Sequence, residues 1–116
     1  MMSTFSDTGD LETVAFRMSL NPGMQDEYRR RHDAIWPELV SALRDAGVVD
    51  YWIFFDADNA ALFAYMQRRR DHRLAQLTDA EVMRKWWAHM ADLMQTDSAC
   101  VPLQVPLQPM FHLAPL

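Results

Sequence analysis

Cysteine, glycine and basic charge are all scarce in this chain of 116 residues. The single cysteine, Cys100, cannot form an internal disulfide, and no cysteine cluster suggests a zinc site. With only three glycines, the sequence has no loop of the kind that cradles phosphate. Eleven basic and 16 acidic residues give a formal charge of -5, which disfavours nucleic acid as a partner. Two arginine triplets, residues 29–31 and 68–70, are local exceptions, and we interpret both as solvated faces.

Long apolar runs are also missing. None approaches the ~20 residues that a membrane-spanning helix needs, so we expect no membrane partner. Residues 1–12 are rich in Ser, Thr, Asp and Glu and lack the apolar stretch of a signal peptide. We expect a flexible leader over residues 1–12 and a single domain over residues 13–116, located in the cytoplasm. Half of the residues are apolar, enough for a real core in one domain.

Apolar periodicity predicts the first strand and helix. Residues 13–20 alternate apolar and more polar side chains, the pattern of a half-buried strand. Asn21-Pro22 should then begin a helix, with Asn as the N-cap and Pro at the first helical position. We expect a kink or break near Pro37, because proline removes a helical hydrogen bond and crowds the preceding turn. Gly47 should end the helix.

The remaining residues predict a hairpin, a second helical region and a last strand. Residues 48–55 and 60–67 are rich in β-branched and aromatic side chains, and a turn of Asp, Ala and Asn separates them. Residues 71–94 should form a helix in two pieces, broken near residues 77–79, with Thr78 or Asp79 as the second cap. Residues 105–113 are the expected last strand, although two prolines weaken that prediction.

The order strand, helix, strand, strand, helix, strand predicts a ferredoxin-like α+β fold. Its four-stranded antiparallel sheet should carry both helices on one face. Aromatic side chains occur on both faces of the predicted strands, since Phe16, Phe54, Phe63 and Tyr65 cannot all face the helices. A second copy of the chain is the simplest way to cover this exposed apolar face, so we predict a homodimer.

One short helical segment carries most of the candidate chemistry. Tyr28 and His32 lie four residues apart, so both side chains project from the same helical face. An imidazole can give or take a proton near neutrality, although ordinary packing or surface placement is the commoner explanation of each residue taken alone. Trp86 and Trp87 are adjacent, so they diverge on a helix, and one could pack while the other lines a cavity mouth. These residues favour cofactor-free acid–base chemistry or simple binding in a small-ligand pocket.

A set of short motifs in a fixed order resembles the L-rhamnose mutarotase family. The motifs are Asn21-Pro22, Glu27-Tyr28-Arg29-Arg30-Arg31-His32, Ile35-Trp36-Pro37-Glu38-Leu39, Arg84-Lys85-Trp86-Trp87 and Phe111-His112-Leu113. The resemblance covers residues 14–113 and implies a dimeric α/β barrel that acts on a monosaccharide without cofactor or metal. It also implies that His32 is the proton donor and that the sugar site is shaped by Tyr28, Tyr51, Trp86 and Trp87.

One departure from the family pattern affects the expected substrate. Asp33-Ala34 stands where the family commonly has Asn-Pro, and a carboxylate beside His32 could raise the pKa of that histidine. L-rhamnose and a related 6-deoxy sugar such as L-fucose are therefore both candidate substrates. Two other hypotheses stay open, a cofactor-free monooxygenase acting on an aromatic compound and a non-catalytic dimeric binding module.

Overall fold

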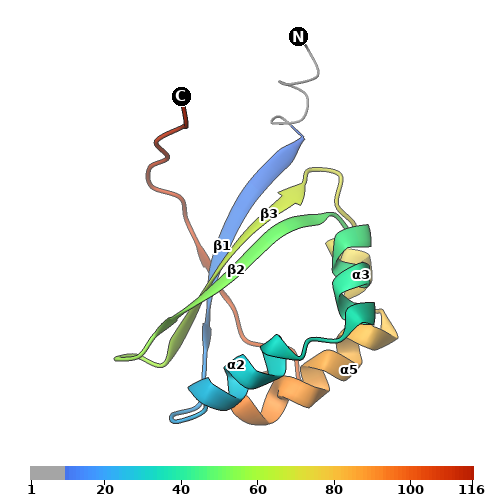
Figure 1. The fold of residues 1–116 in the computed structure, drawn as a ribbon, viewed down its shortest axis with the longest axis vertical. Helices are drawn as coiled ribbons and strands as arrows, with labels where there is room; N and C mark the ends of the chain where they lie inside the picture. Colours follow the sequence, from blue (N-terminus) through green and yellow to red (C-terminus); the bar gives the residue numbers. More distant parts are fainter. Residues whose placement is uncertain (1–9) are drawn as a thin grey trace.

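The computed structural model describes residues 10–116 as a four-stranded antiparallel sheet with helices on one side. The strands are β1 (Leu11–Ser19), β2 (Val48–Asp56), β3 (Ala61–Arg69) and β4 (Val105–Leu107). The helices are α2 (Gln25–Asp33), α3 (Pro37–Asp45), α4 (Leu74–Leu77), α5 (Glu81–Met90) and the 3-10 helix η1 (Ala91–Leu93). The strand order β2-β3-β1-β4 confirms the predicted ferredoxin-like fold, and Figure 1 shows α2, α3 and α5 gathered beside one face of the twisted sheet.

Pro37 divides the first helical region as predicted. Helix α2 ends at Asp33 and α3 begins at Pro37. Proline is tolerated at the first helical position because a backbone N–H there would have no acceptor within the helix. Between them, Trp36 adopts an extended conformation with φ -67° and ψ 130°. Gly47 follows α3 with φ +115°, as the predicted glycine after a helix end. A Cβ at Gly47 would lie 2.9 Å from the Cβ of His72, so only glycine fits there.

The predicted helix start at Asn21-Pro22 is wrong. Pro22 and Gly23 form a turn, Gly23 has φ +80°, and α2 begins at Gln25 without a side-chain cap. The Asn21 side chain is used elsewhere, because its amide donates a hydrogen bond to the Asp92 carbonyl at 3.2 Å. A long-range contact therefore takes the side chain that local pattern assigned to capping.

The second helical region breaks where predicted but is not capped as predicted. A turn at residues 78–79 separates α4 from α5, and the extended Ala80 occupies the N-cap position without a side-chain hydrogen bond. The Thr78 hydroxyl donates instead to the Ala75 carbonyl at 2.7 Å, so neither Thr78 nor Asp79 caps α5. The last strand is also shorter than residues 105–113, since β4 ends at Leu107 and Pro109 has no N–H to donate to a ladder.

Strand β1 begins earlier than predicted. Leu11 and Glu12, assigned to the leader by the sequence, are strand residues, and residues 1–9 of that leader lie outside the described residues. Glu12 accepts a hydrogen bond from Arg68 Nε at 2.7 Å, and Arg70 lies 3.7 Å from the same carboxylate. The Arg68 side chain is only 23% exposed. The second arginine triplet is therefore not the uniformly solvated face that we predicted.

The two faces of the sheet differ sharply in burial. Toward the helices, Leu62 and Met66 of β3 are buried in the core. On the opposite side, Trp52 is 55% exposed and pairs across the strands with Tyr65, which is 38% exposed. We call this side the outer face, and its apolar side chains are Trp52, Phe54, Phe63, Tyr65, Val105 and Leu107. The predicted open apolar face is therefore present.

Candidate functional site

A cavity of about 1300 Å³ lies between the helix-facing side of the sheet and the helices. All of the predicted site residues line it: Tyr28 and His32 from α2, Tyr51 from β2, and Trp86 and Trp87 from α5. Three elements that are distant in the chain thus supply one site. The sequence named the residues, and the fold brings them together.

Tyr28 and His32 stack one helical turn apart, with ring centroids 4.4 Å apart and planes 30° apart. The Nδ1 atom of His32 lies 3.1 Å from the Tyr28 carbonyl oxygen. A carbonyl oxygen only accepts, so Nδ1 carries the hydrogen and Nε2 of the neutral ring has a free lone pair. Burial lowers the pKa of His32, and this outweighs the opposing effects of the Tyr28 carbonyl and the charge on Asp33. The imidazole is therefore held neutral, with Nε2 available as a base.

Trp86 forms the wall beside this histidine. It is buried, at 6% exposure, and its ring meets the His32 ring edge-on with centroids 5.3 Å apart. Trp36 packs behind Trp86 in a second edge-on contact at 5.1 Å, and His89 lies 5.6 Å from Trp86. Trp87 also lines the cavity and is half-buried. The sequence did not assign Trp36 or His89 to the site, because the contacts join residues far apart in the chain.

Tyr51 supplies a second phenol on the sheet side. Its ring lies edge-on to Phe16 at 6.5 Å, and 36% of its surface stays accessible through the cavity. Burial of the hydroxyl raises the pKa of Tyr51 to about 12. The pKa of Tyr28 is also raised, first by burial and then by the nearby Tyr51 phenol. Both phenols therefore stay protonated near neutrality. Each can donate a hydrogen bond to a ligand.

Polar side chains also line the cavity beside these rings. Gln25, Asp26 and Arg29 of α2 and Asp50 of β2 are among them. Such groups suit a ligand that carries several hydroxyls, because each buried hydroxyl needs a hydrogen-bonding partner. Indole and phenol walls suit the C–H faces of the same ligand. The lining thus combines the two surfaces that a sugar presents.

Metal-ligating side chains are dispersed over residues 10–116. Within that range no three His, Cys, Asp or Glu side chains form a group that could hold a metal ion. His32 has aromatic rings and a backbone carbonyl as its neighbours. Over the same residues, no helix has both the length and the apolar character that crossing a membrane requires.

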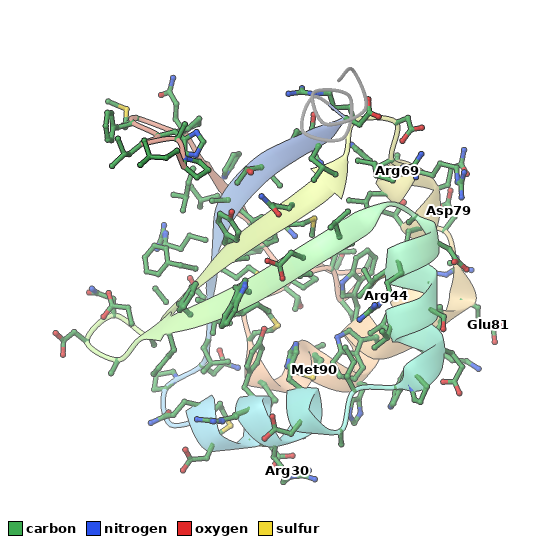
Figure 2. The ribbon with its side chains drawn as sticks, turned by 45° about the horizontal axis from the view of Figure 1, so that its top comes forward. Arg30, Arg44, Arg69, Asp79, Glu81 and Met90 are labelled. Carbon is green, nitrogen blue, oxygen red and sulfur yellow. The ribbon has the colours of Figure 1, made fainter. Side chains whose placement is uncertain are left out.

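The first arginine triplet is not one solvated face, and the prediction that it would be is wrong. Arg30 is 68% exposed, and Figure 2 shows it projecting from α2 away from the sheet. Arg29 lines the cavity. Arg31 is only 15% exposed and bonds to the segment that follows α5. Successive residues on a helix point ~100° apart, so the three consecutive arginines lie in three different environments.

Comparison with protein families places the chain among sugar-converting enzymes. The model of the family described as L-rhamnose mutarotase matches residues 13–113. An L-rhamnose mutarotase of Burkholderia orbicola is 63% identical over 103 residues, which are 89% of this chain and 99% of that protein. An L-rhamnose mutarotase of Brucella anthropi is 54% identical over 102 residues, covering 88% of this chain and 96% of that protein.

Solved structures agree with this placement. A crystal structure of an L-rhamnose mutarotase from Formosa agariphila superposes with a TM-score of 0.82 at 40% identity, covering 89% of this chain and 99% of that chain. A Nitrosomonas europaea protein provisionally assigned as an antibiotic biosynthesis monooxygenase reaches a TM-score of 0.58 at 13% identity, covering 88% of this chain and 92% of that chain. The second likeness shows the fold alone. On the family match and the close relatives, the chain belongs to the L-rhamnose mutarotase family.

Proposed function

We propose that this protein interconverts the α and β anomers of L-rhamnose. The observation that carries the proposal is His32, a neutral imidazole whose tautomer is fixed by the Tyr28 carbonyl inside a cavity walled by aromatic rings. A relative that is 63% identical to this chain is named for this activity. Anomer exchange needs a proton moved between two oxygens and no other co-reactant, which one imidazole can do.

His32 is proposed to act first as a base and then as an acid. Nε2 takes the proton from the anomeric hydroxyl as the C1–O1 bond becomes a carbonyl. The bond between C1 and the ring oxygen breaks, and Nε2 returns the proton to that oxygen, which leaves a neutral aldehyde. After rotation about C1–C2, the same transfers in reverse close the ring on the other face of C1. The two oxygens share C1, so one nitrogen can reach both.

The remaining site residues hold the sugar during this exchange. The protonated phenols of Tyr28 and Tyr51 donate hydrogen bonds to sugar oxygens, while Trp86 and Trp87 pack against C–H faces. At about 1300 Å³, the cavity exceeds the ~300–1,000 Å³ of ordinary ligand pockets. That room lets the open-chain aldehyde rotate without leaving the site. No cofactor and no metal enter these steps.

The protein is proposed to work as a homodimer in the cytoplasm. Apolar side chains crowd the outer face of the sheet, where Trp52 and Phe54 stack with ring centroids 5.7 Å apart and each is 55% exposed. Exposed apolar surface of this kind marks an association site. A second copy placing its own outer face there would complete a dimeric α/β barrel. The single cysteine suits a reducing compartment.

Saturation-transfer NMR on L-rhamnose tests the activity. Saturating the α-anomer H1 signal should reduce the β-anomer signal once the protein is added, and EDTA should leave the effect unchanged. His32→Gln should lose ~10²-fold or more of the exchange rate, because a positioned acid or base contributes ~10²–10⁴-fold. His72→Gln is the matched control, since His72 does not line the cavity. Full exchange with His32→Gln would refute the assignment of the proton carrier.

The same assay distinguishes the sugars. L-fucose has the same anomeric chemistry, so its exchange rate beside that of L-rhamnose measures what the polar lining selects. We expect faster exchange of L-rhamnose, in line with the family. Faster exchange of L-fucose would reassign the substrate and leave the role of His32 intact.

A further inference from the structure

Arg31 joins the helix that carries the proton carrier to the end of the helix that carries the indole wall. Its Nη1 donates to the His89 carbonyl at 2.5 Å and to Asp92 Oδ1 at 2.8 Å, and its Nη2 lies 3.3 Å from Asp92 Oδ2. Its Nε donates to Glu27 Oε2 at 2.8 Å, one turn back on α2. Four hydrogen bonds thus converge on one guanidinium.

Helix α2 depends on such contacts for its orientation. It has nine residues, no side-chain cap at its start and a proline break after its end, and helices of that length are marginal on their own. Arg31 directly precedes His32 in the chain. His89 and Asp92 follow Trp86 closely, so the guanidinium fixes α2 against the segment that positions the indole wall. Any tilt of α2 would change the distance between the His32 and Trp86 rings, which now is 5.3 Å.

We propose that Arg31 is a positioning residue that holds His32 in register with Trp86 by clamping α2 to the C-terminal end of α5. The proposal rests on the proposed function, because it assigns Arg31 a role in the exchange that His32 performs. The Arg31–Asp92 pair and the Arg31–His89 carbonyl bond are the clamp. Glu27 holds the guanidinium plane from within α2.

The chemistry of the contact requires arginine. A guanidinium presents its N–H groups in a rigid planar fork, so it can donate hydrogen bonds to two carboxylates and a backbone carbonyl at the same time. A lysine ammonium is a single point charge and cannot span the same three partners. The last carbonyls of a helix also attract a cation, which adds to the bond with the His89 carbonyl. Since Arg31 is only 15% exposed, these bonds are partly shielded from competing water.

Arg30 provides the matched control. It bonds to the same Glu27 carboxylate through Nε at 2.8 Å, yet its side chain is 68% exposed and these hydrogen bonds stay within α2. Arg30→Ala removes the same charge from the same helix while leaving the clamp in place. Any difference between Arg30→Ala and Arg31→Ala therefore measures the contact between α2 and α5.

The expected result is a loss in kcat with a smaller change in KM. A catalytic group displaced by ~1 Å can cost ~10²-fold in rate, so Arg31→Ala should lower kcat for anomer exchange at least ~10-fold. Arg31→Lys and Asp92→Asn, which disturb folding less, should fall between Arg31→Ala and the wild type. Arg30→Ala should match the wild type. Equal kcat values for Arg30→Ala and Arg31→Lys would overturn the proposal.

A double variant separates positioning from a general loss of structure. If Arg31 acts through His32, adding Arg31→Ala to His32→Gln should cause no further loss in the residual rate. A further loss as large as in the wild-type background would overturn the proposal.

The imidazole signals supply a readout independent of activity. In Arg31→Lys, looser packing should raise the pKa of His32 toward its ordinary value, as followed by NMR titration, whereas Arg30→Ala should leave that pKa unchanged. An unchanged His32 pKa in Arg31→Lys would count against the clamp. If the wild type exchanges no sugar anomers, the proposed function fails, while the NMR titration still decides whether Arg31 positions His32.

Discussion

Trp52 is the most direct test of the outer face as a dimer interface. Its side chain is 55% exposed in the protomer and stacks on Phe54 with ring planes 4° apart. A tryptophan side chain offers ~250 Å² at most, so roughly 140 Å² remains to be covered. At ~25 cal/mol per Å², covering it contributes about 3.5 kcal/mol per copy as an upper value. Twofold symmetry places the residue in the interface twice.

We expect Trp52→Glu to weaken the dimer at least ~100-fold, which corresponds to about 2.7 kcal/mol. This is below the area estimate for two copies, because buried area converts only partly to affinity. A carboxylate buried in an apolar interface without a partner adds a desolvation cost. Trp52→Phe keeps an apolar ring at the same position and should change the dissociation constant by less than ~10-fold.

Sedimentation velocity over a range of protein concentrations measures the change, with circular dichroism as the check that each variant is folded. The wild type should sediment as a dimer and Trp52→Glu as a monomer at the same concentration. A Trp52→Glu variant that remains as dimeric as the wild type would refute the outer face as the interface. A wild type that is monomeric at every concentration would refute the homodimer itself.

Three further results are expected at fixed protein concentration. Trp36→Ala removes the edge contact behind Trp86 and should lower the free energy of unfolding by about 2–4 kcal/mol in urea titrations, with Trp36→Phe losing less. Because burial lowers the folded-state pKa of His32, the unfolded chain takes up a proton first. The stability contributed by neutral His32 should be complete above about pH 6.5 and be lost as pH falls through the folded-state pKa. The value of kcat/KM should fall over the same pH range. His32→Gln should abolish both pH dependences. Tyr51→Phe should lower kcat/KM for L-rhamnose about 10-fold, the loss of one hydrogen bond, with unchanged thermal stability.

Features set by local sterics were predictable from the sequence. Proline cannot sit inside a helix, so the break at Pro37 follows from that residue alone. The positive φ of Gly47 belongs to the same class. The division of the aromatic side chains between the two faces of the sheet also belongs here, because the alternation of side chains along a strand is a backbone property.

Features set by distant partners were not predictable. Asn21 had every local mark of a helix cap, yet its side chain bonds to the Asp92 carbonyl and to the amide of Gln95. In sequence Arg31 does not differ from its neighbours in the basic triplet, and only the fold brings Asp92 beside it. The Trp36–Trp86 contact has the same origin. In each case the deciding partner comes from a part of the chain that no local pattern connects.

The break at Pro37 also bears on how this family can diverge. Helix α3 packs on β2 and α5, whereas α2 carries Tyr28 and His32, and the extended Trp36 backbone separates the two axes. Because the break ends the helical hydrogen-bond ladder, we expect a tilt of α3 to be taken up at this joint before it reaches α2. The two halves of one predicted helix thus have separate axes, so α3 can adjust its packing on β2 and α5 while Tyr28 and His32 keep their places on α2.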